Sequence, residues 1–315
     1  MIPRALTPAA FAARRPGASV RRFSGRAMGT SWSLQAVHAP TSAGEGVRRA
    51  LDRVVRQMSQ WEAESDLSRL NRAPAGEWRA IPPEFARVMA AATAIAEASD
   101  GAFNPALGLL TERWGFGAGG PVAAAPDIAP PEAPPDIAFD AATARVRRGT
   151  GAALDLSGIA KGFGVDLAAE QLLASGVRHF LIEVGGELRG EGVQPDGQPW
   201  WVDVEPPPGL SLAPWRLALH DLSVATSGNY RRGFTDGGRH YSHSFDPRSG
   251  RPIVNGVASV TVVHRSCMIA DGWATALTIV GPERGIALAD AQGLAMQMIA
   301  DGREYASREW RAMLD

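Results

Sequence analysis

Two segments in the first third of the chain have the apolar spacing of amphipathic helices. The first begins near residue 42, behind a Ser42 and Glu45 pair with the spacing of a capping box. The second begins at one of the prolines at positions 82 and 83 and ends at the turn of residues 99–101. We expect the apolar positions of both helices to face the core: Val47, Leu51, Val54, Val55, Met58, Phe85, Val88, Met89, Ala92 and Ile95.

Short runs rich in β-branched and aromatic residues follow in the second half of the chain. They predict strands at 180–184, 200–204, 215–219, 257–263 and 296–299. Helical patterns lie among them at 161–175, 269–280 and 283–291. This interleaving predicts an α+β or mixed α/β class, and we find no internal repeat of fixed period.

Two further segments differ in composition from the rest. Residues 119–135 are dense in proline, alanine and glycine, which predicts a surface loop that is inserted between packed elements.

The first 27 residues contain six arginines and no acid. They lack the apolar stretch of about 7–15 residues that a secretory signal needs, so we expect a cytoplasmic protein. We expect residues 1–24 to form a flexible N-terminal segment and residues 25–315 to form one domain.

Composition excludes several classes of protein. With 315 residues, of which 45% are hydrophobic and 21% charged, the chain can bury a substantial core without disulfides. The net charge of −1 gives no electrostatic reason to expect nucleic acid or an anionic membrane as the main partner. No segment approaches the roughly 20 apolar residues of a transmembrane helix. Cys267 is the only cysteine, which excludes an intrachain disulfide and a cysteine-based zinc cluster and favours a small buried filler.

The candidate chemistry is concentrated in residues 241–275. Asp271 and Thr275 are four residues apart in a helical pattern, so their oxygens should lie on one helix face. Such a pair is a plausible partial ligand set for Mg²⁺, which takes few protein oxygens and completes its shell with phosphates and water. Taken alone, an Asp and a Thr at this spacing are usually only a helix cap or part of a solvated face.

An imidazole and a carboxylate also lie close together in this region. His243 can act as a base near neutral pH, and Asp246 would orient it or support the loop. The alternative is a histidine packed against Tyr241, with Asp246-Pro247 only forming a turn. Together the two pairs indicate metal-assisted phosphate chemistry.

Five ordered motifs carry a resemblance to a known family. They are Ala27-Met-Gly-Thr30, the run from Met58 to Asn71, Gly101-Ala-Phe-Asn-Pro105 with Trp114-Gly-Phe-Gly117, the LDLSGIAKG run from Leu154 to Gly162, and the 241–275 region. The chain thereby resembles the ApbE family of FAD:protein FMN transferases from about Met28 to Gly281. The resemblance implies mixed sheets with packed helices, an FAD pocket between the two halves, and transfer of the FMN part of FAD to a threonine or serine hydroxyl of an acceptor protein, with release of AMP.

The same resemblance implies roles for individual residues. Asp271, Thr275 and the carbonyl of Gly158 match magnesium ligands, and His243 matches the base. The positions that contact FAD are Met28, Trp61, Ala102, Phe103, Asn104, Asp155, Lys161 and Ser244. The chain departs from the common pattern at three of these positions: Trp61 replaces tyrosine, Asn104 replaces aspartate, and Gly158 replaces alanine or threonine. The loop at 119–135 also replaces a helix, and we expect it to alter the acceptor surface.

Other interpretations stay open at this point. Without the resemblance, Met28 and Phe103 would be core residues, Gly158 a turn glycine, and Asp155 the N-cap of the helix that contains Lys161. Two other functions fit the same motifs: a magnesium-dependent FAD pyrophosphatase that releases FMN and AMP, and a non-catalytic flavin-binding protein. A Rossmann oxidoreductase is disfavoured because residues 183–187 do not form a G-x-G-x-x-G turn.

Overall fold

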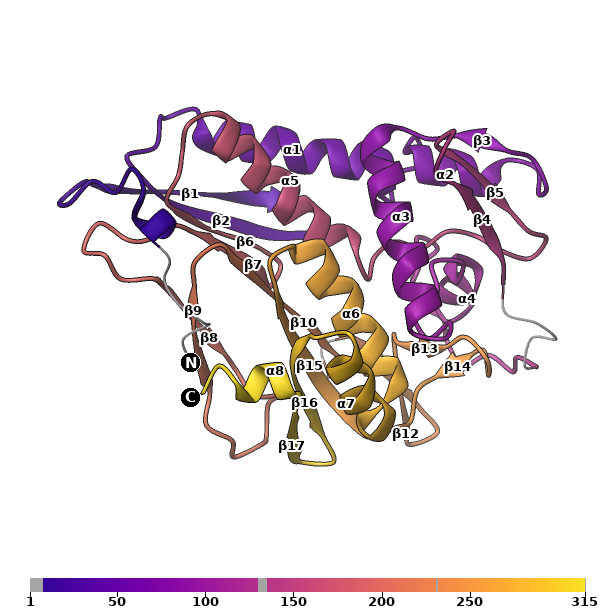
Figure 1. The fold of residues 1–315 in the computed structure, drawn as a ribbon. Coiled ribbons are helices and arrows are strands. Elements are labelled where there is room, and N and C mark those ends of the chain that lie inside the picture. The colour runs from indigo at the N-terminus through magenta and orange to yellow at the C-terminus, as the bar shows by residue number, and fades with distance from the viewer. Residues whose placement is uncertain (1–7, 130–134, 231, 315) are drawn as a thin grey trace.

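The computed structural model describes residues 8–129, 135–230 and 232–314 (Figure 1). Its largest element is an eight-stranded sheet in the order β1-β2-β6-β7-β10-β15-β16-β17. All neighbouring strands in it are antiparallel. The strands are β1 (Val20–Ala27), β2 (Thr30–Val37), β6 (Phe180–Val184), β7 (Glu187–Glu191), β10 (Leu222–Gly228), β15 (Val257–His264), β16 (Ala295–Ala300) and β17 (Arg303–Ala306).

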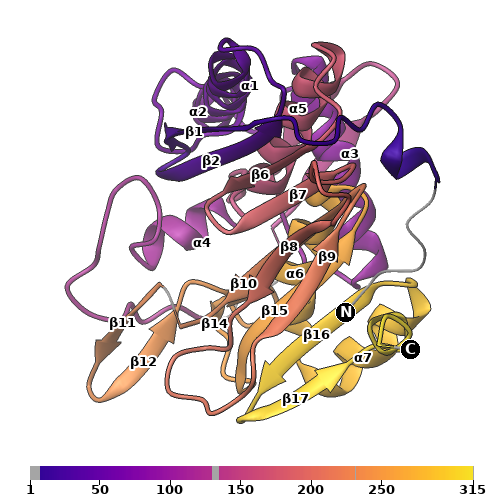
Figure 2. The same ribbon diagram turned by 90° about the vertical axis from the view of Figure 1, so that its left-hand side faces the viewer.

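Helices cover one face of this sheet (Figure 1). They are α1 (Ala43–Met58), α5 (Ala160–Ala174) and α6 (Cys267–Val280), with α3 (Pro83–Ala98) packed against α6 and α7 (Pro282–Ala291) beside it. The other face carries the hairpin of β8 (Trp200–Val204) and β9 (Trp215–Leu219), together with α8 (Arg308–Arg311) (Figure 2). Because side chains alternate along a strand, Val262 of β15 joins the helix-side core and Val263 joins the opposite one.

Smaller elements complete the fold. A three-stranded sheet has the order β3 (Arg79–Ala80), β5 (Arg145–Arg148), β4 (Ile137–Asp140). The others are η1 (Pro8–Phe11), α2 (Asp66–Arg72), α4 (Gly108–Arg113), and the strand pairs β11 (Gly233–Asp236) with β12 (Arg239–Ser242) and β13 (Phe245–Asp246) with β14 (Arg251–Pro252). A separate aromatic cluster, built around Trp114, Phe116 and Phe245, joins α4 to these two strand pairs.

The predicted α+β class, helices and strands are confirmed, with ends that differ by no more than a few residues. Of the core positions, Val55 is only half-buried. The capping box is not formed, since the Ser42 side chain makes no capping hydrogen bond and Glu45 pairs with Arg48 instead. Cys267 is fully buried, as expected.

The predicted segment boundaries need one correction. Residues 20–24 do not belong to a separate N-terminal segment, because they form the first part of β1 and pair with residues 33–37 of β2. The loop prediction is confirmed for residues 119–129 and 135, which contain no helix or strand; residues 130–134 and 1–7 lie outside the described residues. Within the described ranges, no helix is both long and apolar enough to cross a membrane.

A buried cluster of charges ties α5, β7 and α6 together. Asp166 of α5 accepts hydrogen bonds from the first two backbone N–H groups of α6 and from the Ser266 hydroxyl, and so caps that helix. Arg189 of β7 forms ion pairs with both Asp166 and Glu191. The side chains of these acids are only 7% and 9% exposed, so breaking one pair would leave a charge in a poorly solvated place.

Replacement of Glu191 by glutamine is expected to flatten the pH dependence of folding stability. Burial raises the pKa of Glu191 from its ordinary 4.5 to about 7, because desolvation outweighs the attraction of Arg189. Between these values the folded chain binds more protons than the unfolded chain, so stability falls as pH rises, by up to about 1.4 kcal/mol per pH unit. Glutamine does not titrate and removes this slope. Urea unfolding of both proteins at several pH values between these two pKa values measures how the free energy of unfolding depends on pH. If this free energy changed equally with pH in both proteins, the expectation would be contradicted.

Candidate active site

A pocket of about 790 Å³ lies where the helical side, the main sheet and the small strand pairs meet. It is lined by the β1–β2 turn, the end of α1, residues 103–107, residues 155–161, the end of β10, residues 243–245 and α6. The predicted catalytic, FAD-contacting and metal-binding residues all line it except Ala102, which lies in the turn that precedes Phe103; Asp246, predicted to support His243, does not line it either. Segments from both halves of the chain therefore build a single cavity.

A cluster of oxygen atoms lines the part of the pocket beside α6. Asp271 is only 3% exposed, and its Oδ2 accepts a hydrogen bond of 2.9 Å from the backbone N–H of Gly162. Thr275, one helical turn later, donates its hydroxyl to the Gly158 carbonyl at 3.2 Å and lies 3.1 Å from the Ser227 hydroxyl. The predicted ligands Asp271, Thr275 and Gly158 thus lie in one wall of the pocket. Ser227 was missed, because it lies outside the five motifs that carry the family resemblance.

The chemistry of this cluster suits a hard cation that is only partly held by protein. Its donors are a carboxylate, hydroxyls and a carbonyl, all of which are oxygens. Asp271 Oδ1 has no hydrogen-bond partner among the described residues, and burial raises the pKa of this carboxyl. The described parts of the chain contain no group of three or more His, Cys, Asp or Glu side chains that could hold a metal. A cation here would need further oxygens from a substrate.

Gly158 allows a close approach between the loop and α6. A Cβ atom at this position would lie 3.0 Å from Cγ2 and Oγ1 of Thr275, which is tighter than ordinary contact. The lack of a side chain at Gly158 therefore leaves room for the Thr275 hydroxyl beside the Gly158 carbonyl. The departure from alanine or threonine at this position is compatible with a carbonyl ligand.

The ammonium group of Lys161, which lines the pocket, belongs to a buried ion pair. Lys161, in the first turn of α5, donates a hydrogen bond to Oε1 of Glu187, whose side chain is 2% exposed. Burial raises the pKa of Glu187 to about 7, although the charge of Lys161 opposes this shift. Burial also opposes the charge of Lys161, but attraction to Glu187 and Asp271 outweighs it, and the pKa of Lys161 is raised. Sequence reasoning gave Glu187 no role.

His243 directly follows β12 and lines the same pocket as the oxygen cluster. Its Nδ1 lies 3.2 Å from the carbonyl oxygen of Arg232, which can only accept, so Nδ1 carries the proton and Nε2 has the free lone pair. Burial lowers the pKa of His243, and the nearby charges of Arg232 and Lys161 lower it further. The imidazole is therefore neutral near pH 7 and can accept a proton.

The predicted orienting role of Asp246 needs correction. Its carboxylate accepts a hydrogen bond of 3.0 Å from the backbone N–H of Arg248, inside the turn that joins β13 to β14. Asp246 therefore supports the loop, which was the second of its two predicted roles. The Arg232 carbonyl, and not Asp246, orients His243. The alternative packing of His243 on Tyr241 is also not observed: Tyr241 stacks on Phe234, and the ring beside His243 is Phe116, at 6.2 Å between centroids.

The other residues that were predicted to contact FAD lie at different depths in the pocket. Phe103 is 3% exposed and closes the floor, whereas Trp61 is 49% exposed and lies at the mouth. Asn104 Oδ1 accepts from the backbone N–H of Ala106, which fixes its loop. Met28 occupies a two-residue hairpin turn with a φ of 52°, a left-handed conformation that places this side chain beside the pocket. An exposed indole and a polarisable thioether are both suited to contact a planar ring.

Asp155 is not the N-cap of α5. That helix begins at Ala160, with Ile159 in the cap position. The Asp155 carboxylate instead accepts hydrogen bonds from the Thr111 hydroxyl at 2.9 Å and from the backbone N–H of Ser157 at 2.9 Å. Its carboxylate is thus held at the wall of the pocket, where it can accept hydrogen bonds from a ligand.

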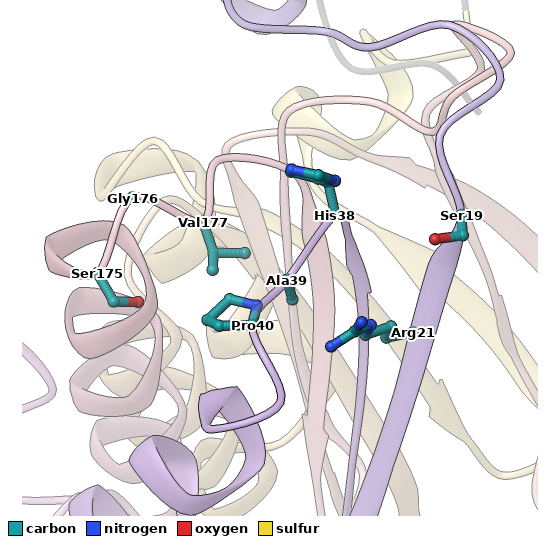
Figure 3. Close-up of a pocket in the computed structure, with 8 residues that line it drawn as sticks. All are labelled: Ser19, Arg21, His38, Ala39, Pro40, Ser175, Gly176 and Val177. Atoms are coloured by element: carbon teal, nitrogen blue, oxygen red, sulfur yellow. The ribbon is translucent and has the colours of Figure 1, made fainter.

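A second hollow, of about 500 Å³, lies at the other end of the β1–β2 hairpin from Met28. Ser19, Arg21 and His38 border it, but Figure 3 shows their side chains spread around the backbone of residues 39–40 without converging on one point. The residues that line this hollow include no acid, so it has no counterpart of the carboxylate and the oxygen cluster of the larger pocket. The larger pocket is therefore the candidate active site.

Comparison with known proteins gives consistent matches over nearly the whole chain. Residues 28–299 match the ApbE family. The FAD:protein FMN transferase of Vibrio cholerae serotype O1 is 35% identical over 320 residues, which cover 93% of this chain and 92% of that protein. The crystal structure of the flavinyl transferase ApbE of Pseudomonas stutzeri, in its apo form, has a TM-score of 0.85 and 33% identity and covers 94% of this chain and 97% of that one. The structure of the flavin transferase ApbE of Vibrio cholerae has a TM-score of 0.82, 34% identity and coverage of 94% and 99%.

Proposed function

The chain belongs to the ApbE family, and we propose that it is an FAD:protein FMN transferase that moves the FMN part of FAD to a threonine or serine hydroxyl of an acceptor protein. One observation carries the proposal. A neutral imidazole, an ammonium group and a set of oxygen ligands line the same pocket, although Gly158 and Thr275, two members of the oxygen set, are 117 residues apart. Transfer at a pyrophosphate needs each of these groups.

The reaction exchanges one bond at phosphorus. The acceptor oxygen bonds to the phosphorus of the FMN phosphate while the bond from that phosphorus to the AMP oxygen breaks, and AMP leaves. His243 Nε2 takes the proton of the acceptor hydroxyl, because its Nδ1–H is already donated to the Arg232 carbonyl. Lys161 donates to oxygens of the pyrophosphate from the first turn of α5, where the backbone also favours anions.

We also propose that Mg²⁺ belongs to this site. Asp271, Thr275 and the Gly158 carbonyl would hold it, in agreement with their hard oxygen donors and the unpartnered Oδ1 of Asp271. When bound, the ion supplies charge neutralisation on the pyrophosphate. Asp155 and Asn104 would contact FAD through hydrogen bonds, and Trp61 and Met28 would contact one of its rings.

Incubation of the purified protein with FAD and Mg²⁺, with and without a domain that bears an accessible threonine, tests the proposal. The expected products are AMP and an acceptor whose mass has increased by FMN less one water. AMP with free FMN and an unmodified acceptor would favour the pyrophosphatase. Bound, uncleaved FAD under every condition would contradict both enzymes and favour a flavin-binding protein. A parallel sample in EDTA measures how far the reaction depends on a divalent cation.

A further inference from the structure

Glu187 is a buried acid that lies behind the pocket without lining it. It is the first residue of β7 and follows the Gly185-Gly186 turn, and its side chain is 2% exposed. Its Oε1 accepts from the Lys161 ammonium group, while its Oε2 is buried and has no hydrogen-bond partner among the described residues. Burial of a carboxyl with one oxygen unpartnered costs folding free energy.

Lys161 has two acids within electrostatic reach. It is hydrogen-bonded to Glu187, and the charge of Asp271 also acts on it. Lys161 and Asp271 both line the pocket, whereas Glu187 does not. If the charge of Glu187 were absent, Asp271 would be the strongest remaining attraction for the ammonium group. An ammonium group bound to Asp271 would compete with a metal ion for the same oxygens.

We propose that Glu187 is a positioning residue: it holds Lys161 in place for the FAD pyrophosphate and away from Asp271, which leaves the Asp271 carboxylate free for a divalent cation. The inference rests on the proposed function, because it concerns the same phosphates and the same cation. Lys161 has three ammonium N–H groups, and the bond to Glu187 uses one of them. The others stay available to the substrate.

Binding measurements on Glu187→Gln test the proposal without relying on turnover. Glutamine keeps the shape and one acceptor oxygen but loses the charge. Affinity for FAD measured by calorimetry in EDTA should fall about tenfold, as expected for loss of a charged hydrogen-bond partner. Affinity for ADP, which carries a pyrophosphate but no flavin to transfer, is then measured over a series of Mg²⁺ concentrations. The Mg²⁺ concentration that produces half of the maximal increase in ADP affinity should be about tenfold higher for Glu187→Gln than for the unaltered protein.

Glu191→Gln is the matched control. Glu191 lies four residues later on the same strand and face, is similarly buried and also pairs with a cation. Its partner Arg189 does not line the pocket, whereas Lys161, the partner of Glu187, does. Glu191→Gln should leave both affinities unchanged. If Glu187→Gln lowers the unfolding temperature but leaves both affinities as in the control, Glu187 has only a structural role and the proposal is overturned.

A double-mutant cycle separates positioning from a direct effect. In the Lys161→Met background, Glu187→Gln should change neither affinity further, because the effect of Glu187 passes through Lys161. Additive losses would overturn the proposal. The unaltered protein must first bind FAD in EDTA and release AMP with Mg²⁺; failure of that test contradicts the proposed function itself, whereas normal binding with an unresponsive Glu187→Gln contradicts only this inference.

Discussion

Asp271→Asn is expected to lower the rate of Mg²⁺-dependent AMP release from FAD by about 1,000-fold, which corresponds to several kcal/mol of lost transition-state stabilisation. Among the described residues Asp271 is the one carboxylate of the oxygen cluster, and the other oxygens there, the hydroxyls of Thr275 and Ser227 and the Gly158 carbonyl, are neutral. Loss of its charge should therefore weaken the hold on a divalent cation more than any other single change in the cluster. Initial rates of AMP release over a series of Mg²⁺ concentrations measure this effect.

Asparagine is a better test than alanine at this position. Its amide oxygen can still accept from the Gly162 backbone N–H, which alanine would leave buried without an acceptor. The unfolding temperature and the affinity for FAD in EDTA should thus stay close to those of the unaltered protein. An Asp271→Asn variant that retains most of its Mg²⁺-dependent rate would refute the assignment of Asp271 as a metal ligand.

Local patterns predicted the elements of this fold because the elements are locally encoded. The apolar spacing of α1 and α3 and the β-branched run of β15 specify helix and strand without reference to the rest of the chain. The sheet order does not follow from such patterns, since β7 pairs with β10 rather than with the next strands, β8 and β9. The same limit explains the wrong boundary at residue 25: the arginines of β1 are exposed on an edge strand and resemble a polar tail in composition.

The candidate site was predictable where its chemistry is contained in one segment. Asp271 and Thr275 lie one helical turn apart, so their spacing alone indicated a shared face. Gly158 meets Thr275 across 117 residues, and only the family resemblance connected them. The Arg232 carbonyl that orients His243 could not be predicted, because any residue supplies a carbonyl and its position depends on the β11–β12 hairpin. Glu187 was missed for a related reason: its partner Lys161 is remote in sequence.

His243→Ala is expected to lower the rate of FMN transfer to an acceptor by about 100- to 10,000-fold, the usual contribution of a general base. FAD affinity in EDTA should change little, because the proposed role of the imidazole concerns the acceptor hydroxyl rather than the phosphates. The pKa of His243 is lowered, mainly by burial, so in the unaltered protein the rate should rise with pH below the ordinary value of 6.5 and level off above it. The variant should lack that rise. Transfer rates and flavin binding of both proteins across the pH range provide the measurement.

The matched control for His243 is a change that keeps the neighbouring turn but leaves the imidazole in place. Asp246→Asn meets this requirement, because the Asp246 carboxylate bonds to the backbone of Arg248 and not to His243. It should retain most of the transfer rate and the same rise with pH, since the Arg232 carbonyl still orients the ring. A loss as large as that of His243→Ala would mean that Asp246 acts on the base after all. Loss of FAD binding in His243→Ala would instead mean that His243 contacts FAD. Removal of a base that acts only on the acceptor hydroxyl would leave the contacts with FAD intact.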